Sequence, residues 1–276
     1  MFFLATAATA VEHGGATPPP SELFLQLYSH VQAHTLFRVP LGEGSSIHIT
    51  NHTIMELMAG IVAFMIFYSV ARMGSRRDRP RGAFHNAFEA VVLFVRDEMV
   101  YKVMHREHAD RLMPLFLTFF IFILFCNLLG LVPIPTVGGT ATGNIAVTAA
   151  LAVVTLFMMI YGGMTILGPV AFWKGLVPHG LPKWMVPFIF TIEVLGLIIK
   201  PFALTIRLFA NMIAGHLVIL SFFGLVFFFE SYIIMMPALL LAVFITLLEV
   251  LVCFLQAYVF TYLSIIFVSM AIQPEH

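Results

Sequence analysis

The sequence predicts an all-α, polytopic membrane protein, and three observations lead to this fold class. Of the 276 residues, 61% are hydrophobic and only 10% are charged, whereas a soluble domain carries about 25% charged residues. Nine of the fourteen Lys and Arg residues lie between Arg72 and Arg111. Several apolar runs exceed the roughly 20 helical residues that cross a hydrocarbon core of about 30 Å. An ordinary soluble globular protein is therefore excluded.

The charge balance limits the classes of partner and ligand. The formal net charge is zero, so there is no general electrostatic attraction to nucleic acid, and we expect no nucleic-acid partner. The two cysteines, Cys126 and Cys253, lie inside apolar stretches and are expected to pack as small hydrophobic side chains. His30 and His34 are one helical turn apart, but no third metal ligand accompanies them. We therefore expect no metal ion and no cofactor.

Residues 1–51 are predicted to form an extramembrane N-terminal segment, and residues 52–276 to form the membrane domain. The first fifty residues mix short apolar pieces with Gly and Pro turn formers. Residues 1–10 are apolar, but no basic residue precedes them, so a cleaved signal peptide is the less favoured interpretation.

The first membrane span is predicted at about residues 54–71. Asn51, His52 and Thr53 precede it and are suited to cap it, and five arginines follow between residues 72 and 81. Because positively charged loops stay inside, the N-terminus is expected outside. Residues 83–104 have apolar side chains at helical spacing with charged ones between them. This stretch is too polar to cross, so we expect an amphipathic helix on the inner surface.

Two further spans form a predicted transmembrane hairpin. They lie at about residues 112–132 and 145–167, joined by a connection rich in Pro and Gly. Residues 112–173 contain no Asp, Glu, Lys, Arg or His, which is enough apolar chain for two crossings. The loop that follows carries Lys174 and Lys183, as expected for an inner loop.

The last two apolar stretches, about residues 185–229 and 233–272, are too long for simple crossings. At about 1.5 Å per residue, each helix would be about twice the hydrocarbon thickness. Splitting the first would leave a loop of Leu, Ile and Phe with few turn residues. We therefore predict two long tilted helices joined near Glu230 and Ser231, which places the C-terminus inside.

These two helices carry ionisable residues at membrane depth, which cost at least about 2.5 kcal/mol each on insertion scales and by default mark function. Glu193, Lys200 and Arg207 are spaced by seven, so they share one face, and Asn211 follows Arg207 by one turn. His216 lies nine residues after Arg207, on roughly the opposite side of the same helix.

On the last helix, Glu249 and Gln256 share a face. If the two helices fold back on each other between residues 231 and 232, positions at about equal distance from this joint lie at the same depth. This arrangement predicts two layers of paired residues. Arg207 should meet Gln256 in the deeper layer, and His216 should meet Glu249 nearer the outer side. We also expect Gly215 and Gly224 to permit close helix approach.

The chemistry of the layers differs. A guanidinium keeps its proton at any ordinary pH, whereas imidazole and carboxylate groups exchange theirs. A fixed cation at Arg207 would repel a proton passing straight through and favour ionisation of an acid brought beside it. The pattern indicates two half-paths that a moving carboxylate must join. Both cations also have a purely structural interpretation. Arg207 could hydrogen-bond to backbone carbonyls, and Lys200 could pack against its neighbours or snorkel to the membrane surface.

Residues 200–216, KPFALTIRLFANMIAGH, closely resemble the signature of subunit a of F-type ATP synthases. Residues 127–133, 248–249 and 255–260 are similar to the same family, and the resemblance runs from the first span to the C-terminus. The resemblance implies a non-catalytic proton-channel subunit in which Arg207 faces a rotating c-ring and separates two half-channels. It implies that the outer half-channel is lined by Asn211, His216, Glu249 and Gln256, and that the inner one contains Glu193.

The implied partners are the c-ring proteolipids, b-type peripheral stalk subunits, the remaining synthase subunits and the lipid bilayer. In the familiar bacterial arrangement the acid stands at the position of His216 and the histidine at that of Glu249, so this chain resembles mitochondrial forms in having them exchanged. We expect a bacterial inner membrane, with the mitochondrial inner membrane as the alternative. Protons are expected rather than sodium, because imidazole is a poor ligand for a hard cation.

The sequence is less compatible with two other classes of function. A self-contained secondary transporter or channel would also use tilted helices and charges at the midplane, but no internal repeat is evident. An intramembrane enzyme is disfavoured, because H-E-x-x-H, G-x-S-x-G and phosphate-loop motifs are absent.

Overall fold

The computed structural model describes residues 35–42, 45–74, 83–132, 141–177, 182–229 and 232–272. Within these residues, four helices are long and apolar enough to cross a membrane. They are α6 (Arg106–Leu131), α7 (Ile145–Leu167), α9 (Val186–Phe229) and α10 (Tyr232–Ile272). The predicted polytopic helical fold is confirmed to this extent. The two long helices are unsplit, as predicted from the lack of turn residues.

A β-hairpin precedes the helices and was missed in the sequence. Strand β1 (Thr35–Gly42) pairs antiparallel with β2 (Ser45–Thr50), with Arg38 opposite His48. The alternating β-branched residues of β2, with Gly42 and Gly44 ahead of them in the sequence, are the available signals. Residues 1–34, with the apolar start and the His30/His34 pair, lie outside the described residues.

Helix α3 (Asn51–Gly74) covers the residues of the first predicted span. Its apolar part, His52–Tyr68, is shorter than the four helices above, so a crossing by α3 stays a prediction. Its capping was predicted one residue too late. The helix begins at Asn51, and the hydroxyl oxygen Oγ1 of Thr50 accepts the backbone N–H of Thr53 at 3.4 Å. Thr50 therefore serves as the N-cap, because the residue that ends the strand is also the last non-helical one. His52, Met55 and Ala59 are buried on α3, and the last two pack against Cys126 of α6.

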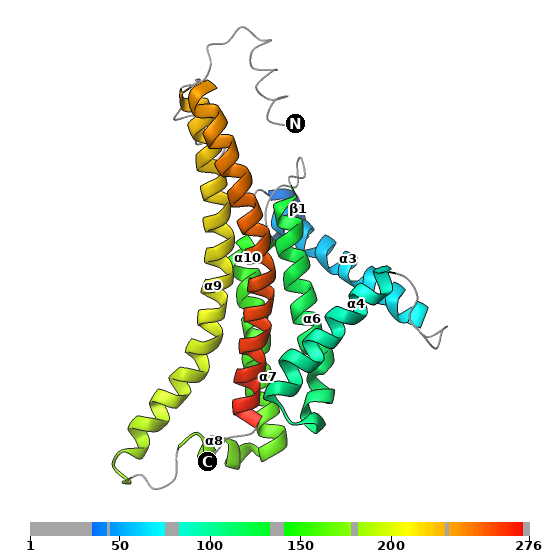
Figure 1. The fold of residues 1–276 in the computed structure, drawn as a ribbon. Coiled ribbons are helices and arrows are strands. Elements are labelled where there is room, and N and C mark those ends of the chain that lie inside the picture. Colours follow the sequence, from blue (N-terminus) through cyan, green and yellow to red (C-terminus); the bar gives the residue numbers. More distant parts are fainter. Residues whose placement is uncertain are drawn as a thin grey trace.

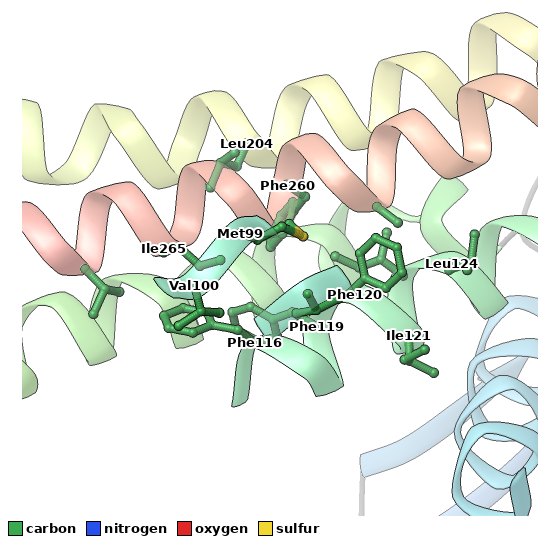
Figure 2. Close-up of a cluster of buried hydrophobic side chains, with 14 of the residues drawn as sticks. Met99, Val100, Phe116, Phe119, Phe120, Ile121, Leu124, Leu204, Phe260 and Ile265 are labelled. Carbon is green, nitrogen blue, oxygen red and sulfur yellow. The ribbon is translucent and has the colours of Figure 1, made fainter. Parts of the chain in front are cut away.

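The amphipathic stretch predicted at residues 83–104 is helical, but its middle turns are wider than an α-helix. It consists of α4 (Ala83–Leu93), a π-helix η1 (Phe94–Val100) and the short α5 (Tyr101–Val103). Three apolar side chains of η1, Val95, Met99 and Val100, are fully buried in the main hydrophobic cluster. Figure 2 shows Met99 and Val100 beside Phe116 and Phe260. One face of this segment is therefore held by protein.

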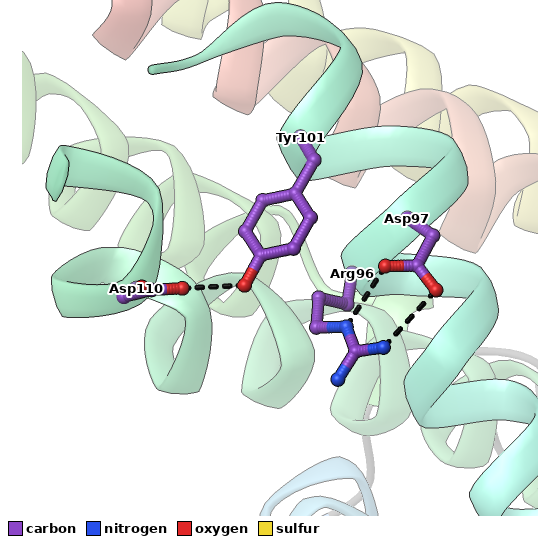
Figure 3. A network of polar contacts seen from close by, with 4 residues as sticks. All are labelled: Arg96, Asp97, Tyr101 and Asp110. Atoms are coloured by element: carbon purple, nitrogen blue, oxygen red, sulfur yellow. Dashed lines mark hydrogen bonds and ion pairs between the residues drawn. The ribbon is translucent and has the colours of Figure 1, made fainter. Parts of the chain in front are cut away.

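Polar contacts on the opposite face join α5 to the start of α6, with an ion pair of η1 beside them (Figure 3). Arg96 Nε donates to Asp97 Oδ1 at 2.8 Å, and the Tyr101 hydroxyl donates to Asp110 at 2.5 Å. The guanidinium groups of Arg96 and Arg106 lie over the Tyr101 ring, at 5.8 and 5.3 Å from its centroid. The hydrogen bond from Arg96 lowers the pKa of Asp97, and the bond to Asp110 raises the pKa of Tyr101.

Helices α6, α7, α9 and α10 form the body of the molecule. Figure 1 shows α9 and α10 side by side at their joint and diverging towards the opposite end. Pro201 lies within α9, where it removes one backbone donor. Ser269 of α10 donates to the carbonyl of Val103 at 3.0 Å, which ties α10 to the end of α5.

The turn after α7 depends on two glycines. Gly168 adopts φ +89° between α7 and α8 (Pro169–Gly175), a conformation that L side chains rarely adopt. A Cβ added at Gly163 would overlap the Phe172 ring and lie 3.0 Å from the carbonyl oxygen of Ala271. Gly163 therefore lets α7 pack closely against both α8 and α10.

We predict that Gly163→Ala destabilises the chain by about 1–3 kcal/mol, because the methyl group overpacks this contact. The matched control is Gly196→Ala in α9, where no atom lies within 4 Å of an added Cβ, and where alanine should be neutral or stabilising. The measurement is the apparent melting temperature of the detergent-purified chain. Equal melting temperatures for both variants would contradict the close packing.

Candidate functional site

Helices α9 and α10 carry all six residues predicted from the sequence to form the functional site. Leu204, Leu208 and Met212 form a fully buried apolar row along α9. Of the polar residues, Arg207 and Asn211 on α9 are exposed, whereas Glu249 and Gln256 on α10 are buried. The site therefore has a buried part between helices and an exposed part on one face of α9.

The buried part contains a histidine–carboxylate pair. His216 Nε2 lies 3.8 Å from Glu249 Oε1, and the side chains are 23% and 5% exposed. The predicted pairing of His216 with Glu249 is confirmed. The separation is too long for a hydrogen bond, and among the described residues neither His216 Nε2 nor either buried carboxylate oxygen has a hydrogen-bond partner. Such groups normally require a partner such as an ordered water.

Gly215 determines how closely the Glu249 carboxylate approaches α9. A Cβ added at Gly215 would overlap that carboxylate. The expectation that Gly215 permits close helix approach is therefore confirmed, whereas the one for Gly224 stays a prediction.

The second layer differs from the predicted one by a helical turn. The amide nitrogen of Asn211 donates to Gln256 Oε1 at 2.8 Å, so the expected pairing of Arg207 with Gln256 is wrong. Helical side chains lean towards the N-terminus of their own helix. Side chains on α10 therefore lean towards the joint between the two helices, and side chains on α9 lean away from it. Two residues at equal distance from the joint consequently lean apart. Gln256 is farther from the joint than Asn211, so the two side chains lean towards each other.

Arg207 lies on an exposed face of α9. Within the described part of the chain it has no hydrogen bond and no ion pair, so the alternative of a tie to backbone carbonyls has no support. Ala203, Ala210 and Ala214 are exposed at helical spacing around it. This face presents a fixed cation surrounded by small side chains.

The structure does not bring the other two charged residues of the stripe to this site. Glu193 is exposed and lies near the start of α9, and α9 diverges from α10 towards that end (Figure 1). Lys200 is half-buried, with its Nζ 5.7 Å from the centroid of the Phe267 ring. This cation–π contact favours the packing role for Lys200.

Three further buried polar residues were not singled out as site residues from the sequence. Thr142, in the 3₁₀ turn η2 (Ala141–Gly143), donates to Asn127 Oδ1 at 2.8 Å, and η2 packs against α9. The Asn127 amide nitrogen and the Thr261 hydroxyl are buried, and no described residue is their hydrogen-bond partner. A lone amide in the apolar α6 was a usable signal for Asn127, whereas Thr142 requires the tertiary fold.

Comparison with known proteins identifies the family. The family model for the ATP synthase A chain matches residues 53–269. The chain belongs to this family. It is 42% identical over 228 residues to ATP synthase subunit a of Myxococcus xanthus, covering 83% of this chain and 74% of that protein. With subunit a of Chloroherpeton thalassium the identity is 42% over 238 residues, covering 84% and 69%.

A third relative extends the match towards the N-terminus. ATP synthase subunit a 2 of Chlorobaculum tepidum is 39% identical over 282 aligned positions, which cover 96% of this chain and 76% of that protein. Family membership and the four apolar helices together make the chain an integral membrane protein.

We predict that Asn211 and Gln256 are energetically coupled. In a double-mutant cycle of alanine substitutions, the losses of stability should be non-additive by about 1 kcal/mol, the value of one hydrogen bond. The matched cycle with Arg207→Ala and Gln256→Ala should be additive. The measurement is the apparent melting temperature of the purified chain. Coupling in the second cycle instead of the first would indicate that Arg207, and not Asn211, pairs with Gln256.

Proposed function

We propose that the chain is the proton-translocating stator subunit of an F-type ATP synthase and has no catalytic site of its own. Family membership and the names of the relatives support this proposal. In it, two offset half-channels load and unload the carboxylates of a rotating c-ring, and Arg207 separates them. The other partners are b-type peripheral stalk subunits and the remaining subunits of the synthase.

The observation that carries the proposal is the state of Arg207. A charged side chain at membrane depth normally faces protein or water and has a partner, yet within the described residues Arg207 has none. Its small neighbours Ala203, Ala210 and Ala214 allow another helix to approach closely. A carboxylate on a neighbouring helix would supply the missing partner, and the cation would favour its ionised form.

The unpartnered buried atoms support an outer half-channel between α9 and α10. They belong to His216, Glu249 and Gln256, and water is the group that would satisfy them. Asn211 continues this polar line onto the exposed face through its bond to Gln256. Protons would enter by the exchangeable His216/Glu249 pair and pass Gln256 and Asn211 to the ring carboxylate.

The inner half-channel begins at Glu193 in this proposal. The divergence of α9 from α10 supports water access from that end (Figure 1). A ring carboxylate that passes Arg207 would lose its proton to this side, because the fixed cation stabilises the ionised acid. Each charge that moves through 100 mV contributes about 2.3 kcal/mol.

The proposed orientation follows from the charges. The basic segment after α3 and the lysines before α9 lie inside, so the N-terminus of the chain is outside and the C-terminus inside. The proposed location is a bacterial inner membrane, in line with the organisms of the relatives. A self-contained channel is disfavoured because Arg207 has no ion-pair partner in the described part of the chain. Reconstitution of the chain without a c-ring should give no proton conductance.

We predict that Arg207→Ala abolishes ATP-driven proton pumping and leaves the complex assembled, because the barrier between the half-channels is lost. Pumping is measured in inverted vesicles by quenching of a pH-sensitive acridine dye, and assembly by co-purification of the c-ring. The matched control is Arg111→Ala, which removes an exposed arginine of α6 outside the site. Normal pumping by Arg207→Ala would refute the proposed role.

Cys253 offers a test of the outer half-channel with a native thiol. It is fully buried on α10, four residues after Glu249 and three before Gln256. If water reaches the unpartnered atoms on either side, silver ions should reach the thiol and inhibit pumping. We predict inhibition in a Cys126→Ala background and its loss on adding Cys253→Ala. Unchanged pumping in the Cys126→Ala background would argue against water there.

A further inference from the structure

A pocket separate from the proton path lies between α8 and the first turns of α9. It has a volume of about 570 Å³. Its lining is apolar apart from one cation, and includes Val170, Trp173, Lys174, Val186 and Phe190. Trp173 and Phe190 form one wall, with ring centroids 6.3 Å apart. The dimensions and lining suit a hydrocarbon chain with a negatively charged group beside Lys174.

The sequence around the pocket has the composition of a membrane interface. The only two tryptophans of the chain, Trp173 and Trp184, lie within this short segment, and tryptophan is enriched at the level of lipid headgroups. Between residues 112 and 192, the only Asp, Glu, Lys or Arg residues are Lys174 and Lys183. The local charge is therefore positive, with no acid to neutralise it.

We propose that this pocket binds an anionic phospholipid, with the phosphate at Lys174 and an acyl chain along Trp173 and Phe190. Basic sites between helices on the inner side of a membrane commonly hold such headgroups. Charge complementarity selects the anionic lipid over a zwitterionic one, and the apolar lining selects a lipid over free phosphate. This proposal rests on the proposed orientation, which puts Lys174 on the inner side, but not on the proton path, because none of the lining residues belongs to that path.

The experiment uses the fluorescence of Trp173 in the full chain reconstituted into vesicles. The chain has two tryptophans, so Trp184→Phe leaves Trp173 in the pocket as the only fluorescent reporter. Trp184 is 78% exposed, and its replacement should disturb the fold little. Phosphatidylcholine vesicles receive equal small fractions of either brominated phosphatidylglycerol or brominated phosphatidylcholine, whose bromines quench nearby indoles. We expect about fivefold tighter association of the anionic lipid, which corresponds to about 1 kcal/mol.

Three further variants in this background test the site. Lys174→Gln should remove the preference for the anionic lipid, and Lys174→Arg should keep it. The matched control is Lys183→Gln, which removes an exposed cation of the same loop that does not line the pocket and should keep most of the preference. Equal quenching by both lipids would overturn the proposal. So would an equal loss in the Lys174→Gln and Lys183→Gln variants, which would indicate general surface attraction.

Discussion

The cost of leaving a polar group without a partner in a low-dielectric environment governs this structure. The helices meet that cost locally where they can: Thr118, Thr155, Thr205 and Thr246 each donate to the carbonyl four residues earlier. Buried amides are joined across helices, as in the Asn127 and Gln256 pairs. Among the described residues, most of the buried polar atoms that still lack a hydrogen-bond partner belong to α9 and α10. Their position therefore indicates where water or another partner is needed.

The direction in which helical side chains lean determines which residues of α9 and α10 meet. Glu249 and Gln256 are each farther from the joint than their partners on α9, so they lean towards them. Gly215 then allows the carboxylate to lie against the α9 backbone. Because the two positions face each other, exchanging the histidine and the acid preserves the pair. In this chain the acid occupies the more buried position, at 5% exposure against 23%.

Much of the fold follows from the sequence, because apolar length and charge spacing are local properties. The two long helices followed from the scarcity of turn residues near residues 185–229, and the His216–Glu249 pair followed from counting along them. The π-helical turns at Phe94–Val100 and the Thr142–Asn127 bond depend on tertiary packing instead. The partner of Gln256 was misassigned because counting from the joint ignored the lean of the side chains.

That one-turn correction changes what Arg207 is able to do. If Gln256 Oε1 accepted from the guanidinium, an incoming carboxylate would have to displace an existing partner. Instead Oε1 accepts from Asn211, and the remaining polar atom of Gln256, its amide nitrogen, is a donor. A guanidinium is also only a donor, so it cannot pair with that nitrogen, and among the described residues Arg207 makes no bond to the second lone pair of Oε1. The site therefore satisfies its amide oxygen internally and leaves the cation on α9 available to an acid from outside the chain.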